Sequence, residues 1–251
     1  MIVDIRFLYI MDKEVKDNVL DNQKLLPLKE ISERFRCVLF DMDGVLYNSM
    51  PNHAIAWVKA LKEFGIKFTP EDSYATEGAR GVDTIRLYVK KQLGKEITEA
   101  QAQKIYDVKT QYFHELPTAE IFDGVKDLMR KIKSEGLQIC VVTGSGQRPL
   151  FQRLVDDFGE FIDRDHIVTA YDVKRGKPNP DPYLMGLKKC GNVNPSEGIV
   201  VENAPLGIRA GVAAGCFTIA INSGPLPDSV LLAEHPNMLF KSIRELCDKI
   251  K

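Results

Sequence analysis

The chain has 251 residues, 44% of them hydrophobic, which is enough for one sizeable core and a smaller second lobe. Its formal net charge is -1, from 34 basic and 35 acidic residues, so no overall field favours a nucleic acid or an anionic membrane surface as a partner. Asp4 and Arg6 interrupt the apolar start and no run approaches the roughly 20 residues needed to span a bilayer, so we expect a cytoplasmic protein.

The first part of the chain divides into three segments. Residues 1–34 are polar and mixed, and we expect an N-terminal extension there, either a poorly ordered arm or a small packing element. The apolar run CVLFD at 37–41 predicts a buried strand. Between 53 and 122 only helical patterns follow, such as AIAWVKALKEFG, GVDTIRLYVKKQLG and EAQAQKIYDVKTQYF. This stretch predicts a helical domain inserted after the first strand.

The rest of the chain alternates strand and helix patterns. Further apolar runs are LQICVVTG from Leu137, HIVTAYD from His166, GIVVEN from Gly198 and CFTIAIN from Cys216. Amphipathic segments such as GVKDLMRKIKSEG and APLGIRAGVAAG lie between them. The alternation predicts an α/β fold with a doubly wound parallel sheet, whose core domain comprises residues 35–52 and 123–251.

Polar side chains follow four of the predicted strands at the point where each strand ends. They are Asp41 and Asp43 after the first, Thr143, Gly144 and Ser145 after the second, Lys177 in the loop after the third, and Glu202 and Asn203 at the end of the fourth. Because ligands bind at the carboxyl ends of parallel strands, we expect these side chains to converge. Carboxylates, an amide, a hydroxyl and a lysine at one sheet edge are typical of a site for magnesium and phosphate.

The two aspartates can divide the work of phosphoryl transfer. A carboxylate whose charge is screened can attack phosphorus and form an aspartyl phosphate, which makes Asp41 the candidate nucleophile. Asp43 can then give a proton to the leaving oxygen and take one from water. The alternatives are a plain turn at these aspartates and a solvated loop charge at Lys177. The convergence of all these groups on one edge favours the catalytic interpretation.

The segments DMDGV, VVTGSG, RGKPNPDPY and VVENAPLGIRAGVAAG resemble, in this order and spacing, the four motifs of the haloacid dehalogenase superfamily. The helical insert lies where the beta-phosphoglucomutase-like branch carries a helical cap of the C1 type, so residues 53–122 would be the cap domain. The resemblance implies a Mg²⁺ cofactor, bound by Asp41, by the main-chain carbonyl of Asp43 and at the Glu202-Asn203 position. It also implies that the Thr143 hydroxyl and the neighbouring backbone amides donate to the phosphoryl group, while Lys177 neutralises charge.

Two further residues lie at the start of the insert. His53 lies one helical turn before Trp57, so it could face the site entrance, and Ser49 lies just before it. In mutase relatives the matching histidine couples cap closure to the active site, which makes Ser49 and His53 candidate substrate-binding residues. The alternative is a histidine packed at a domain hinge. The remaining histidines lack metal-ligand spacing and receive no role.

The chain departs from the family pattern at two places. Asn203 stands where relatives carry an aspartate that binds magnesium, so the site loses one negative charge. In the cap loop ATEGARGVDTI, Gly81 takes the position of a phosphate-gripping arginine, and Arg80 is offset by one. We therefore expect Glu77 to reach the metal, directly or through water, and to supply the missing charge. The alternative is an ordinary exposed glutamate on the cap.

These observations predict a Mg²⁺-dependent phosphohydrolase acting on pyrophosphate or a small sugar phosphate. The first alternative is a beta-phosphoglucomutase, which would need a firm grip on a second phosphate, for which the offset Arg80 is the candidate. Another is a non-catalytic phosphate-binding or interaction protein. We expect a monomer or weak homo-oligomer. The five cysteines, without CxxC spacing, are expected to be buried thiols.

Overall fold

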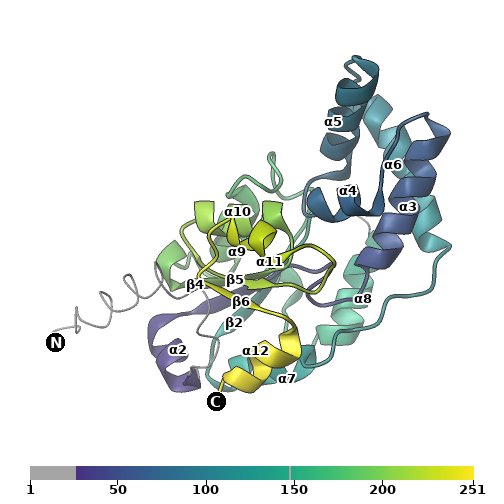
Figure 1. The fold of residues 1–251 in the computed structure, drawn as a ribbon. Helices are drawn as coiled ribbons and strands as arrows, with labels where there is room; N and C mark the ends of the chain where they lie inside the picture. The colour runs from purple at the N-terminus through teal and green to yellow at the C-terminus, as the bar shows by residue number, and fades with distance from the viewer. Residues whose placement is uncertain (1–26, 147) are drawn as a thin grey trace.

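The computed structural model describes residues 27–146 and 148–251, so most of the predicted N-terminal extension lies outside it. Six parallel strands form one sheet in the order β3-β2-β1-β4-β5-β6, which confirms the predicted doubly wound α/β fold (Figure 1). The strands are β1 (Cys37–Phe40), β2 (Gln138–Val142), β3 (Ile167–Val168), β4 (Gly198–Glu202), β5 (Phe217–Ile221) and β6 (Met238–Phe240). Five of them were predicted from their apolar runs, and β6 was missed.

Helices cover both faces of the sheet, which explains why the strands are continuously apolar. One face carries α7 (Val125–Ser134), α8 (Arg148–Phe158) and α12 (Ile243–Lys249), and the other carries α9 (Asp181–Lys189), α10 (Pro205–Ala213) and α11 (Asp228–Leu232). In β1, Val38 and Phe40 face the first set, while Cys37 and Leu39 face the second. Both faces of β1 are therefore buried.

A short helix, α2 (Leu28–Arg34), covers the sheet before β1 begins. Its Leu28 and Ile31 pack against the core cluster that contains Val38 and Phe40. The last part of the predicted extension is thus a packing element, and the prediction for residues 1–26 falls outside the described residues. Single 3-10 turns, Arg164–His166 and Pro195–Glu197, precede β3 and β4.

The insert contains α3 (Met50–Glu63), α4 (Pro70–Ala75), α5 (Gly81–Leu93) and α6 (Glu99–His114), which lie together apart from the sheet (Figure 1). They enclose a separate apolar cluster that includes Trp57 and Ile85. Residues 53–122, all of them described, contain no strand, as predicted. The chain enters and leaves the insert side by side, because the Asn48 N–H donates to the Glu120 carbonyl at 2.9 Å. The division into core and cap domains remains a prediction.

Two predictions from composition can be compared with the fold. All five cysteines are buried free thiols, as expected. Over the described part of the chain, every helix is too short or too polar to cross a membrane.

Candidate active site

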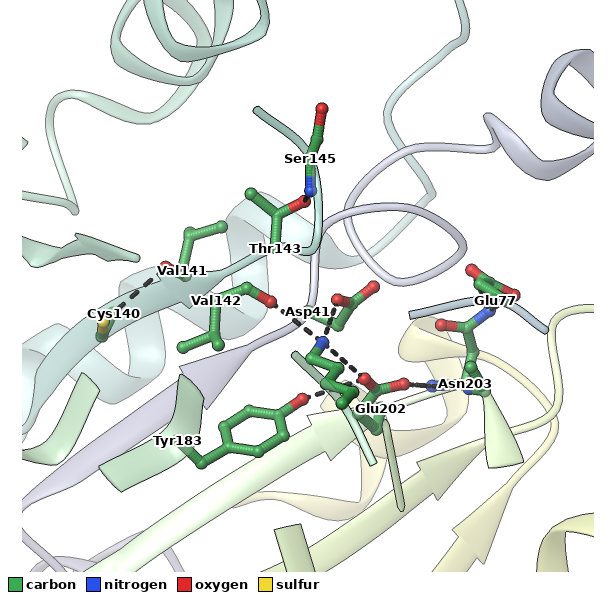
Figure 2. A network of polar contacts seen from close by, with 12 residues as sticks. Asp41, Glu77, Cys140, Val141, Val142, Thr143, Ser145, Tyr183, Glu202 and Asn203 are labelled. Atoms are coloured by element: carbon green, nitrogen blue, oxygen red, sulfur yellow. Dashed lines mark hydrogen bonds and ion pairs between the residues drawn. The ribbon is translucent and has the colours of Figure 1, made fainter. Parts of the chain in front are cut away.

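The carboxyl ends of β1, β2 and β4 meet at the point where the strand order reverses, and the predicted polar residues lie there (Figure 2). Asp41 follows β1, Thr143 follows β2 and Asn203 follows β4. The loop after β3 brings Lys177 to the same edge. Asp41, Thr143, Lys177 and Asn203 are all buried. The structure therefore brings together residues that are separated by up to about two thirds of the chain.

Lys177 lies between two carboxylates. Its Nζ donates to Asp41 Oδ1 at 2.5 Å and to Glu202 Oε1 at 2.7 Å, and the Val142 carbonyl accepts from it at 3.1 Å. Burial alone would lower the pKa of Lys177, but the two carboxylates outweigh burial and hold that pKa above its usual value. Burial raises the pKa of Asp41, with Lys177 opposing and Glu202 reinforcing the rise. Lys177 is therefore a permanent cation beside the candidate nucleophile.

Glu202 holds Lys177 in place rather than facing the cavity. Its Oε1 also accepts from the Tyr183 hydroxyl at 2.9 Å, and its Oε2 accepts the backbone N–H groups of Asn203 at 2.8 Å and Ala204 at 2.9 Å. A Cβ at position 207 would lie 1.6 Å from Glu202 Oε1, so only glycine leaves room for this carboxylate. These contacts favour a positioning role for Glu202 over the predicted role as a metal ligand.

Two side chains predicted to bind substrate contact Asp43 instead. The Ser49 hydroxyl donates to Asp43 Oδ1 at 2.6 Å, and His53 Nε2 lies 3.2 Å from the same oxygen. Burial raises the pKa of Asp43, but His53 and Ser49 outweigh it, so that pKa lies below its ordinary value. Ser49 and His53, at the start of α3, thus orient the candidate acid–base group.

Lys109, which the sequence analysis did not identify, extends this contact chain into the insert. Its Nζ lies 2.7 Å from His53 Nδ1, and its side chain is 1% exposed beneath the rings of Trp57 and Phe113. Burial lowers the pKa of Lys109 to about 7, and burial together with Lys109 lowers the pKa of His53. In its charged form Lys109 can only donate to Nδ1, which places the proton of a neutral His53 on Nε2, the ring nitrogen that lies 3.2 Å from Asp43 Oδ1. The signal available in the sequence was a lysine on the same stripe of α6 as Ile105.

The loop after β2 forms another wall of the site. The Thr143 Oγ1 accepts the backbone N–H of Ser145 at 3.0 Å, which leaves the hydroxyl proton to be directed elsewhere. Thr143, Gly144 and Ser145 all line the same cavity as Asp41. A Cβ on Gly144 would lie 2.8 Å from the carbonyl oxygen of Gly78, so the two loops approach each other closely at this point.

Glu77 comes from the loop between α4 and α5 and reaches the core. Asn203 Nδ2 donates to both carboxylate oxygens of Glu77, each at 2.9 Å (Figure 2). Glu77 lines a cavity of about 60 Å³ together with Asp41, Asp43 and Thr143. Burial, followed by the charge of Asp41, raises the pKa of Glu77 well above its usual value. Glu77 is therefore not a solvent-exposed glutamate, and the expectation that it reaches the metal stays a prediction.

Arg80, another predicted substrate-binding residue, does not line the catalytic cavity. Its guanidinium donates to both carboxylate oxygens of Asp83, at 2.8 and 3.0 Å, and lies 3.6 Å from Glu99. Arg80 instead lines a neighbouring cavity of about 280 Å³, which also touches Tyr106 and Tyr171. Its positive charge is therefore largely balanced by carboxylates of the insert.

The oxygen atoms around Asn203 fit a hard cation. Asn203 Oδ1 is buried without a hydrogen-bond partner, and such an atom is rare unless a ligand completes it. No three His, Cys, Asp or Glu side chains within residues 27–146 and 148–251 form a metal site by themselves. A cation here would therefore depend on the amide oxygen of Asn203 and the main-chain carbonyl of Asp43, beside the carboxylates of Asp41 and Glu77. An all-oxygen set of this kind suits Mg²⁺.

Comparison with known proteins supports this assignment of the motifs. The family model for haloacid dehalogenase-like hydrolases matches residues 35–215. Hexitol phosphatase A of Escherichia coli is 32% identical over 193 residues, covering 76% of this chain and 84% of that protein. Validoxylamine A 7'-phosphate phosphatase of Streptomyces hygroscopicus is 29% identical over 212 residues, covering 84% and 96%.

A solved structure extends the match to the fold as a whole. A protein from Bacteroides vulgatus, provisionally described as a beta-phosphoglucomutase, is 46% identical with a TM-score of 0.83. The match covers 95% of this chain and 94% of that one. The chain is thus a phosphatase-type enzyme of the haloacid dehalogenase-like hydrolase family, in its beta-phosphoglucomutase-like branch.

Proposed function

We propose that this enzyme is a Mg²⁺-dependent phosphohydrolase that acts through phospho-Asp41, with inorganic pyrophosphate as its preferred substrate. The observation that carries the proposal is the contact of Glu77 with Asn203, at 2.9 Å, inside a cavity of about 60 Å³. A third carboxylate beside Asp41 and Asp43 repels an anionic substrate unless cations lie between them. A small, highly charged substrate that arrives with its own Mg²⁺ fits this cavity better than a hexose does.

Asp41 performs the first displacement. One of its carboxylate oxygens accepts from Lys177, which leaves the other to attack phosphorus. The Asp41–phosphorus bond forms as the bond from phosphorus to the leaving oxygen breaks. Lys177 balances charge next to the transferring group, and the Thr143 hydroxyl donates to a phosphoryl oxygen as its charge develops.

Asp43 handles the protons of both steps. Because its pKa is lowered, Asp43 rests as a carboxylate and must first take up a proton, which it then gives to the leaving oxygen. The carboxylate that this step regenerates removes a proton from the water that attacks the phosphorus of phospho-Asp41 and releases phosphate. Ser49 and His53 keep the carboxyl group of Asp43 oriented through both steps. Lys109 fixes the orientation of His53 in turn.

A cation bound by Asp41, Asp43, Asn203 and Glu77 would screen the negative charge of the nucleophile and the phosphate. The charge of Glu77 is needed to bind this cation because of the residue at position 203. Asn203 supplies an oxygen but no charge, and the cap carboxylate restores the charge that an aspartate would have contributed.

A second candidate substrate class is small sugar or polyol monophosphates. The neighbouring cavity of about 280 Å³ adjoins the catalytic one at Gly81, Tyr106 and Gly144. Its lining carries Glu99 and Asp107 beside Arg80, so it suits a neutral or cationic group better than a second phosphate. The named activities of the hexitol and validoxylamine phosphate phosphatases are consistent with such substrates.

A mutase is the runner-up, supported by the Bacteroides vulgatus relative. A mutase must hold a second phosphate firmly while the intermediate reorients. The pairing of Arg80 with Asp83 and Glu99 weakens this candidate, because the guanidinium is already committed.

The test is phosphate release by purified protein with Mg²⁺, comparing pyrophosphate with hexose, hexitol and other small phosphates, with Asp41→Asn as the blank. Pyrophosphate far ahead of all esters supports the proposal, and a preference for an ester overturns it in favour of the second class. If no phosphate is released from any substrate, a coupled assay for the conversion of beta-glucose 1-phosphate to glucose 6-phosphate follows. No conversion in that assay either, together with saturable binding of Mg²⁺ or phosphate, would identify a non-catalytic binding protein.

A further inference from the structure

An apolar groove separate from the catalytic cavity is lined by residues of α2, α7, α12 and the sheet face that these helices cover. Figure 1 shows where α2, α7 and α12 lie in the fold. Its volume is about 340 Å³, and its lining is almost entirely apolar, including Ile31, Val38, Leu128, Phe217 and Ile250. An apolar cavity of about 150 Å³ already binds a benzene molecule, so this groove has room for two or three large apolar side chains. Native interiors rarely leave such a space unfilled.

The chain itself arrives at the rim of this groove. Pro27 and Leu28, the first described residues, both line it. The Leu28 N–H donates to the carbonyl of Lys251 at 2.6 Å, which fixes the start of α2 beside the C-terminus. In the preceding segment, residues 1–26, residues 11–26 connect the first ten residues to this rim, and sixteen residues can span up to about 50 Å, more than enough to bring residues 1–10 back to the groove.

The composition of this segment matches the groove. Its first ten residues, MIVDIRFLYI, are apolar except for Asp4 and Arg6. The lining also contains Glu30 and Arg34, so each charge of the segment has an opposite charge available.

We propose that residues 1–10 dock in this groove and fill it with apolar side chains such as Ile5 and Phe7. The segment then completes the core cluster beneath α2, and the groove is an intramolecular docking site. This inference is independent of the proposed catalytic function, because the groove and the active site share no lining residue.

Hydrogen–deuterium exchange on the full chain tests the proposal without any substitution. We expect the amides of residues 2–10 to exchange at least about 10-fold more slowly than in an unstructured peptide. Exchange at the unstructured rate would overturn the docking.

Point variants provide a second, independent test. Ile5→Asp and Phe7→Asp are expected to lower the melting temperature by about 3 °C or more and to increase the fluorescence of an added apolar dye. Asn18→Asp, a charge-matched control in the same segment, is expected to change neither, and no variant should alter phosphate release. Wild-type behaviour of both variants would overturn the proposal. So would saturable binding of decanoate by the wild-type chain, or a dimer that Phe7→Asp dissociates, since either would identify another occupant.

Discussion

The contact between Glu77 and Asn203 leads to a quantitative prediction about metal affinity. Glu77→Gln keeps the size of the side chain and a hydrogen bond to Asn203 but removes the negative charge that the Glu77 carboxylate would carry once a cation offsets its burial and the charge of Asp41. The Glu77 carboxylate lies 2.9 Å from Asn203 Nδ2, in the same amide group as the unpaired Oδ1. At a separation of about 4 Å and an effective dielectric constant of 20, a carboxylate and a divalent cation would interact by about 8 kcal/mol, twice the value for two unit charges.

Rearrangement and water recover part of that energy, so we expect Glu77→Gln to weaken Mg²⁺ binding by about 10- to 100-fold. The assay is the Mg²⁺ concentration for half-maximal phosphate release, together with calorimetric titration of Mg²⁺. Glu71→Gln, at an exposed position of α4, is the matched control and should behave as wild type. Asn203→Asp in the Glu77→Gln background should restore affinity, because it returns a carboxylate to the core side. An unchanged Mg²⁺ requirement in Glu77→Gln would refute the reasoning.

Three further predictions concern groups around the two aspartates. Lys109→Met should lower kcat by about 10- to 100-fold with little effect on KM, because it removes the side chain that orients His53 beside Asp43. The control variant Lys104→Met, at an exposed position of α6, should leave kcat unchanged. Steady-state kinetics tests this, and equal kcat values for the two variants would contradict the role of Lys109. Thr143→Val should reduce kcat by about 10²- to 10³-fold through loss of a phosphoryl donor, and a change in KM alone would argue against it. Gly207→Ala should displace Glu202, lowering both the melting temperature and kcat, since a Cβ there would lie 1.6 Å from the carboxylate; a variant with wild-type stability and turnover would show that this packing is adjustable.

The sheet could be predicted from the sequence because strands that are buried on both faces form continuous apolar runs. The strands β1, β2, β4 and β5 read as continuous apolar runs, and each is followed by the turn or polar residue that ends it. The strand β6 was missed because Met238–Phe240 is an isolated three-residue apolar run between Asn237 and Lys241, whereas the shorter β3 lies at the start of the longer stretch HIVTAYD. Short edge strands are defined by their neighbours rather than by their own composition.

Some residues of the candidate site could likewise be predicted from the sequence, and others could not. Residues that immediately follow a strand, such as Asp41 and Thr143, could be placed at one edge from topology alone. Lys109 could not, because a lysine on a cap helix reads as a solvated charge until its burial beside His53 is seen. Arg80 was expected to face substrate, but its partners Asp83 and Glu99 lie close to it in the folded insert. The i,i+3 spacing of Arg80 and Asp83 could have revealed the first pairing, whereas the second depends on tertiary placement.

The absence of a side chain at position 144 has a consequence for selectivity. The cap loop rests on this glycine so closely that one added methyl group would meet the Gly78 oxygen at 2.8 Å. A methyl group at position 144 would push the loop that contains Gly78 away from the loop after β2, which would admit water and enlarge the catalytic cavity. We therefore expect the lack of a side chain at Gly144 to restrict the substrates that fit the site, and Gly144→Ala to hydrolyse a wider range of phosphate esters.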